Sequence, residues 1–145
     1  MKKNRPLAVA LVLAIAMLSA ACTPATSNSG NVEPSDVVSA VKAAGPRVVD
    51  ASAERTVTGL SWGWLVDAVL SGNEPVTPDE LGAILLAARR AGGADPSDVD
   101  LFAKDESGTS LDLTAPADQL GLRYANIGAG IGVMRSEIDA VLGSE

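Results

Sequence analysis

The spacing of apolar side chains from residue 34 onward predicts more helix than strand. In several stretches apolar residues recur three and four positions apart, as they do on the buried face of an amphipathic helix. The clearest stretch begins at Thr77, which forms a capping-box pattern with Glu80, and Pro78 stands at the first helical position. The predicted helices cover residues 35–44, 61–72, 77–91 and 133–142.

Strands are predicted where β-branched or apolar residues alternate with polar ones. Residues 47–59 form one such extended segment. Residues 99–113 predict two short strands around a loop, in which Gly108 supplies a positive φ. These elements predict a single small α+β domain that is helix-dominant, with about four helices and a short β-hairpin; an all-α bundle is the alternative.

The first 22 residues carry a different pattern. Lys2, Lys3 and Arg5 precede an apolar run from Leu7 to Leu18, and small residues follow it. This order is typical of a secretory signal peptide. A helix of this length covers only about 18 Å at 1.5 Å per residue, whereas a membrane span crosses about 30 Å of hydrocarbon.

Cys22 is the only cysteine of the chain and directly follows this run. The stretch Leu18-Ser19-Ala20-Ala21-Cys22 resembles the lipobox of bacterial lipoproteins, with Ser19 where that family favours leucine. The resemblance implies cleavage before Cys22, attachment of a diacylglyceryl group to its thiol and further acylation of the new N-terminus. It also implies that the lipid bilayer is a partner and that the protein lies on the extracytoplasmic side of the cell membrane.

Three segments are therefore expected: a signal peptide at 1–21, the lipidated Cys22 with a flexible tether at 22–33, and an acidic globular domain at 34–145. The whole chain has 11 basic and 18 acidic residues, a net charge of −7. Loss of the three basic residues in the signal peptide leaves 8 basic residues and a net charge of −10. Because nucleic-acid binders are basic, we expect no nucleic acid as a partner.

The chain contains no histidine, and its one cysteine is expected to be acylated. This excludes Ser-His-Asp triads, Cys-His pairs and HExxH zinc sites. We therefore expect a non-enzymatic domain with no cofactor, which binds an envelope protein or ligand. The alternative is a carboxylate-based hydrolase of envelope polysaccharide, which two facing carboxylates in a cleft would favour.

Two segments have compositions found in ligand sites. Five acidic residues fall within 95–106, a composition that could form a calcium site. Their order does not match an EF-hand loop. The favoured interpretation is that some of them cap helices and the others lie on a solvated hairpin. The pattern G-x-G-x-G within 126–133 precedes a predicted helix, as glycine-rich patterns do in phosphate-binding loops. The interpretation favoured over a phosphate site is that these glycines allow tight backbone packing or form a mobile apolar loop.

Trp64 is the candidate binding residue. In the helix predicted at 61–72 it points away from the apolar stripe, on the side that carries Asp67 and Ser71. A tryptophan in that place is either covered by another element or exposed as an anchor for a partner.

Overall fold

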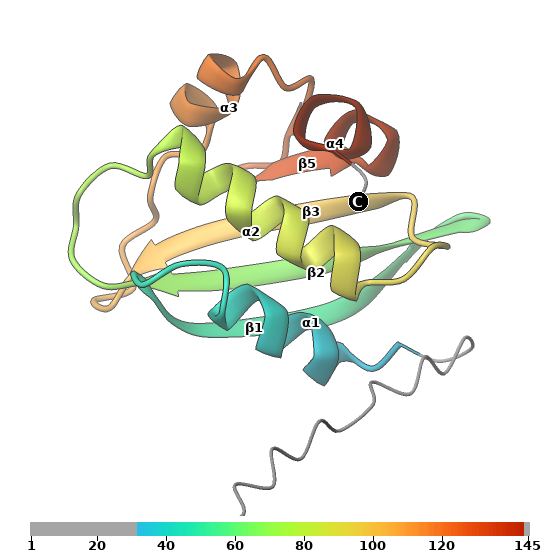
Figure 1. Cartoon of the computed structure of the whole chain (residues 1–145), viewed down its shortest axis with the longest axis horizontal. Helices are drawn as coiled ribbons and strands as arrows, with labels where there is room; N and C mark the ends of the chain where they lie inside the picture. The colour runs from blue at the N-terminus through green and yellow to red at the C-terminus, as the bar shows by residue number, and fades with distance from the viewer. Residues whose placement is uncertain (1–31, 144–145) are drawn as a thin grey trace, which may run out of the picture.

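The computed structural model describes residues 32–143. The predicted signal peptide, Cys22 and most of the predicted tether lie outside the described residues. In these residues a five-stranded sheet is combined with four helices (Figure 1). The elements are α1 (Pro34–Lys42), β1 (Val48–Thr58), β2 (Ser61–Leu70), α2 (Pro78–Ala91), β3 (Asp98–Asp105), α3 (Thr114–Leu120), β4 (Ala125–Asn126), β5 (Ile131–Met134) and α4 (Arg135–Leu142).

The sheet is mixed, with the strand order β1-β2-β3-β5-β4. β1 and β2 form an antiparallel hairpin whose two-residue loop, Gly59-Leu60, lies between the paired Thr58 and Ser61. Gly59 has a φ of 65°, the left-handed conformation that such short loops require. Helix α2 then returns the chain so that β3 runs parallel to β2, while β5 and β4 complete the sheet in antiparallel pairs.

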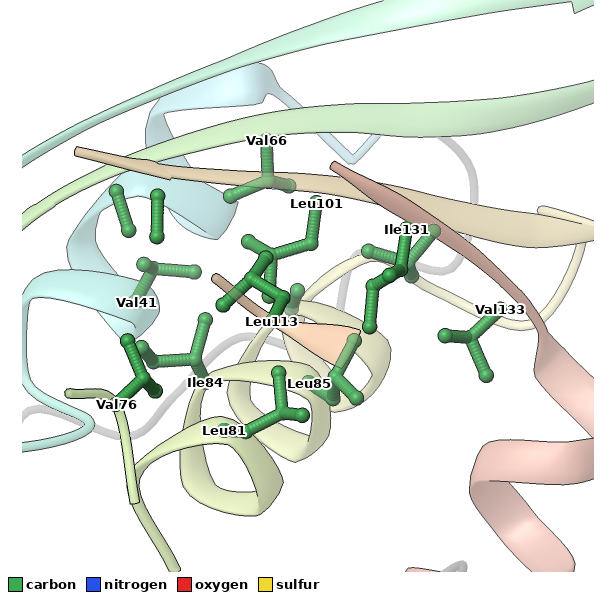
Figure 2. Packing of buried hydrophobic residues seen from close by; sticks show 14 of the residues in the cluster. Val41, Val66, Val76, Leu81, Ile84, Leu85, Leu101, Leu113, Ile131 and Val133 are labelled. Carbon is green, nitrogen blue, oxygen red and sulfur yellow. The ribbon is translucent and has the colours of Figure 1, made fainter. Parts of the chain in front are cut away.

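One face of the sheet, here called the helix face, is covered by α1 and α2 (Figure 1). Its central side chains, which include Val66, Leu101 and Ile131, are completely buried. Figure 2 shows them directed towards Leu81 and Leu85 of α2. Helices α3 and α4 pack against α2, so the hydrophobic core is enclosed between α2 and the sheet.

The opposite face, here called the open face, is less buried. Along β3, Val99 and Leu101 are buried on the helix face, whereas the alternating Asp98, Asp100 and Phe102 on the open face are half-buried. Among the described helices, α1 and α2 lie on the other face, and only the start of α4 borders Asp98 and Asp100. No helix among residues 32–143 combines the length and apolar character needed to cross a bilayer.

The prediction of a helix-dominant domain is wrong, and so is the all-α alternative, because the described structure has about 34% helix and 32% strand. The largest error is at 61–72, predicted as a helix and observed as β2. The even-numbered side chains from Trp62 to Leu70 point to the helix face. Leu65 and Val69 on the open face are also apolar, so apolar and polar residues do not alternate along this strand. Together with Trp62, Val66 and Leu70, they give the three- and four-residue spacing that is typical of an amphipathic helix.

Several local predictions are confirmed. Helix α2 begins with the predicted capping box: Thr77 Oγ1 accepts a hydrogen bond from the Glu80 amide at 3.2 Å, and Glu80 Oε2 accepts one from the Thr77 amide at 2.9 Å. Helix α1 and strand β1 lie where a helix and an extended segment were predicted.

The predicted hairpin at 99–113 is only half correct. Its first strand is β3, but Ser110 joins the sheet through a single bridge to Lys104, and 111–113 is not a strand. The predicted helix at 133–142 begins later, at Arg135, because Val133 and Met134 pair with β3 as part of β5.

Candidate binding pocket

A pocket of about 540 Å³ lies on the open face, where β3, β4 and β5 meet the start of α4. We call it the Asp100 pocket. Asp98 and Asp100 line it from β3, Ile127 from the turn after β4, and Met134 from the end of β5. The volume falls within the range of about 300–1,000 Å³ found for small-molecule sites.

Strand alternation places the two carboxylates in the pocket. Val99 between them turns into the core, so Asp98 and Asp100 both project from the open face. Two glycines on neighbouring strands leave room for them. A Cβ at position 63 would lie 2.5 Å from Asp98 Oδ1, and a Cβ at position 132 would lie 2.7 Å from Asp100 Oδ1.

The carboxylates of Asp98 and Asp100 lie close enough for their negative charges to repel each other. Among the described residues, none of the ion pairs includes Asp98 or Asp100. Ser97 donates a hydrogen bond to Asp98 Oδ1 through its hydroxyl group. Burial raises the pKa of the Asp100 carboxyl above its ordinary value, and the negative charge of Asp98 raises it further. A cation placed in the pocket would relieve this repulsion.

A third carboxylate of the pocket, Glu137, is already neutralised. Arg123 donates to Glu137 Oε2 from Nε at 2.9 Å and from Nη2 at 2.7 Å, and its backbone amide donates to Oε1 at 3.1 Å. These hydrogen bonds hold the pKa of Glu137 below its ordinary value. Glu137 is only 7% exposed, so the ion pair fixes the start of α4 against the segment before β4.

The remaining wall of the pocket is largely apolar. It is formed by Ile127, Ala125, Met134, which is 58% exposed, and Tyr124. The hydroxyl group of Tyr124 donates to Asp118 Oδ1 of α3 at 3.0 Å. Burial, with this hydrogen bond, raises the pKa of the Tyr124 hydroxyl. The pocket therefore combines two carboxylates that are outside the described ion pairs, the Arg123–Glu137 ion pair and an apolar surface.

Trp64 does not form the predicted binding surface. Its side chain is completely buried, and its Nε1 donates to the Gly92 carbonyl oxygen at 3.0 Å. It also contacts the ring of Trp62, with the ring centroids 5.5 Å apart. The strand geometry of β2 turns Trp64 to the helix face, so the correction follows directly from the error in secondary structure. Cys22, the predicted lipidation site, lies outside the described residues.

The acidic segment 95–106 is divided by its strand. Asp98 and Asp100 enter the pocket, whereas Asp105 lies in the turn after β3 and accepts hydrogen bonds from the amides of Ser107 and Thr109. Within residues 32–143, no three side chains of the types that bind metals gather closely enough to hold an ion.

The glycine-rich segment forms the turn between β4 and β5. A Cβ at Gly130 would lie 2.5 Å from the Leu101 carbonyl oxygen and 2.7 Å from the ring of Phe102. The glycine thus lets the turn pack against β3, which is the structural role favoured from the sequence.

Sequence reasoning missed the Asp100 pocket and the Arg123–Glu137 pair. The only local signal was the alternation Asp98-Val99-Asp100-Leu101, which places two acidic residues on one side of a strand.

Comparison of the chain with protein-family models, with curated proteins and with solved structures finds no match.

Proposed function

We propose that this protein is a bacterial envelope lipoprotein whose domain binds a cationic group in the Asp100 pocket. Acylated Cys22 holds it at the extracytoplasmic side of the membrane. The lipobox-like sequence before Cys22 supports the anchor. The observation that carries the binding role is the pair Asp98 and Asp100, half-buried in a pocket and without a cationic partner among the described residues.

The chemistry of the pocket defines the class of ligand. Half-buried carboxylates are stabilised by a cation that donates hydrogen bonds, such as an ammonium or guanidinium group. The adjacent Ile127, Met134 and Tyr124 favour a ligand that carries this group on an apolar stem. A lysine or arginine side chain of an envelope protein has this combination, as do small alkyl amines.

The hydrolase alternative has one observation in its favour, which is the raised pKa of Asp100 beside a second carboxylate. A glycosidase, however, places its two carboxyl groups on either side of the bond that breaks. Asp98 and Asp100 lie two residues apart on one strand and so form the same wall of the pocket. The carboxylate contributed by α4, Glu137, is occupied by Arg123. This arrangement supports binding better than hydrolysis.

The binding role is tested by calorimetric titration of the full chain, purified from membranes in detergent. The probes are N-acetyl-lysine methylamide, its arginine analogue and the uncharged norleucine analogue. We expect the two cationic probes to bind and the norleucine probe to bind at least about tenfold more weakly, because a hydrogen bond to a charged group contributes about 1.5–3 kcal/mol.

Variants localise that binding. The double substitution Asp98→Asn and Asp100→Asn is expected to lower the affinity for the cationic probes by about tenfold or more. Asp67→Asn is the matched control, because Asp67 is a half-buried carboxylate on the same face but outside the pocket. Equal binding of the norleucine probe, or an unchanged affinity of the double variant, contradicts the proposal. Release of reducing sugar from cell-wall polysaccharide that is lost in Asp100→Asn would favour the hydrolase instead.

The anchor is tested separately by cell fractionation and mass spectrometry. The natural chain is expected in the membrane fraction, cleaved before Cys22 and carrying acyl groups. Cys22→Ser is expected to remain uncleaved at this site and unacylated. A natural chain that carries no acyl group contradicts the anchor, and it leaves the binding role of the Asp100 pocket to its own test.

A further inference from the structure

The end of the β1–β2 hairpin carries the two most exposed large hydrophobic side chains of the described residues, Leu60 in its loop and Val57 near the end of β1. Leu60 is fully exposed and Val57 is 76% exposed. We call residues 57–62 the hairpin tip. Figure 1 shows the hairpin extending beyond the ends of the neighbouring strands, so the tip stands away from the core. Exposed apolar side chains on a projecting loop are free to enter another apolar phase.

The base of the hairpin tip has the residues that favour a membrane interface. The guanidinium carbon of Arg55 lies 4.1 Å from the centroid of the half-buried Trp62 ring. Tryptophan is enriched at the headgroup level of membranes, and arginine can keep its charge in water while its stem lies along apolar groups. Arg55 is also the only charged residue in 55–66, although the chain has 18 acidic residues.

The N-terminal end of the described chain lies at the same end of the sheet. Val32 lies close to Gly93, since a Cβ at Gly93 would be 2.9 Å from Val32 Cγ2. The adjacent Gly92 accepts the hydrogen bond of Trp64, near the tip end of β2. Helix α1 then runs away from this end, because Lys42 in its last turn pairs with Asp50 near the start of β1 at 3.2 Å.

The number of residues between Cys22 and Val32 sets an upper limit on the distance between the anchor and the domain. Ten peptide units separate Cys22 from Val32, and they span at most about 36 Å even when fully extended. From Trp64, which lies near that end of the domain, β2 reaches Leu60 over about 13 Å at the rise of a strand. The described chain thus begins at the end of the domain that carries the hairpin tip, and at most about 36 Å of extended chain separates Val32 from Cys22.

We propose that the hairpin tip docks on the lipid bilayer that holds Cys22, with Leu60 and Val57 entering the outer hydrocarbon and Trp62 and Arg55 at the headgroups. This inference rests on the lipid anchor in the proposed function. The segment 55–66 contains no carboxylate, so docking of this segment removes no carboxylate of its own from water. The second attachment point fixes how the domain is oriented on the membrane, which a flexible tether alone does not do.

The test uses the full acylated chain reconstituted in vesicles of phosphatidylethanolamine and phosphatidylglycerol. Because the thiol of Cys22 is acylated, L60C provides one reactive thiol for an environment-sensitive fluorophore. V49C is the matched control, since Val49 is an exposed valine, 43% accessible, near the other end of β1. Lipids with brominated acyl chains quench only fluorophores that enter the hydrocarbon.

We expect brominated lipids to quench the label of L60C several-fold more strongly than the label of V49C. In L60C, the additional substitution Val57→Asp is expected to reduce this quenching while the protein stays with the vesicles. Equal quenching of L60C and V49C overturns the inference, and so does a spectral shift of the L60C label without quenching by lipid. Chains that lack acyl groups and do not enter the vesicles contradict the anchor instead, so the two failures are distinguishable.

Discussion

The two faces of the sheet use the same strands for different purposes. On the helix face, Val66 and Leu101 are completely buried beneath the helices. On the open face, one position away in sequence, Leu65 and Asp100 remain half-buried. Since consecutive side chains of a strand point to opposite faces, one run of residues supplies both the core and the surface proposed to bind a cation. The difference in burial predicts that stability and the proposed binding can be changed separately by substituting neighbouring residues.

The largest difference is expected between Leu101→Ala and Phe102→Ala. Leu101 is completely buried, so its truncation is expected to lower the free energy of unfolding by about 2–5 kcal/mol, which includes the cavity that remains. Phe102 is half-buried on the open face, and its truncation is expected to cost roughly 1–2 kcal/mol. Denaturant unfolding followed by circular dichroism measures both. Equal losses would show that a layer covers the open face as closely as the helices cover the other.

Two glycines of the β4–β5 segment give the next largest contrast. A Cβ at Gly130 meets the backbone oxygen of Leu101, which cannot move away cheaply, so Gly130→Ala is expected to cost about 1–3 kcal/mol of stability. A Cβ at Gly132 meets the carboxylate of Asp100, which can rotate. Gly132→Ala is therefore expected to cost less stability and to weaken binding of N-acetyl-lysine methylamide by narrowing the Asp100 pocket. A loss of stability without loss of binding at Gly132 would argue against the pocket.

The smallest effect on stability is expected for Asp100→Asn. Unlike the substitutions above, it is expected to raise the free energy of unfolding at pH 7. Because the folded state raises the pKa of Asp100, it binds the proton more tightly than the unfolded state does. Stability of the natural protein therefore falls as the pH rises from the ordinary carboxyl pKa through the raised value. Removal of the charge is expected to stabilise the domain slightly at pH 7, since partial exposure screens the effect.

The measurement for Asp100→Asn is the denaturation midpoint at pH 7 and at pH 3. The stabilisation should disappear at pH 3, where the Asp100 carboxyl of the natural protein is protonated. Combined with weaker binding of the cationic probes, this result would mark Asp100 as a residue kept for binding at a cost in stability. Destabilisation at pH 7 would mean that Asp100 serves the fold.

Features fixed by near neighbours could be predicted from the sequence. Helix α2 carries its own start signal in Thr77, Pro78 and Glu80, and the hydrogen bonds that these residues make lie within one turn. The alternation in β3 was also visible, because Val99 and Leu101 are apolar and Asp98 and Asp100 between them are charged. Such signals depend little on the rest of the chain.

The rest depends on residues distant in sequence. The sequence of β2 fits a helix as well as a strand because apolar residues occupy both faces of the strand, and only its pairing with β1 and β3 distinguishes the two structures. The Asp100 pocket exists because β5 pairs with β3, which brings Gly132 beside Asp100. No local pattern encodes that pairing. For the same reason the sequence leaves open whether Trp64 is buried or exposed, because its partner, the carbonyl of Gly92, lies 28 residues away.

The most direct measurement is a nuclear magnetic resonance titration of the full acylated chain in detergent micelles with N-acetyl-lysine methylamide. Backbone amide signals around Asp100, Gly132 and Met134 are expected to shift with a common dissociation constant. Signals of Leu60 in the hairpin tip are predicted to stay in place. Saturating probe that moves none of the pocket signals, or moves chiefly signals outside the pocket, would contradict the claim that the open face is the binding face.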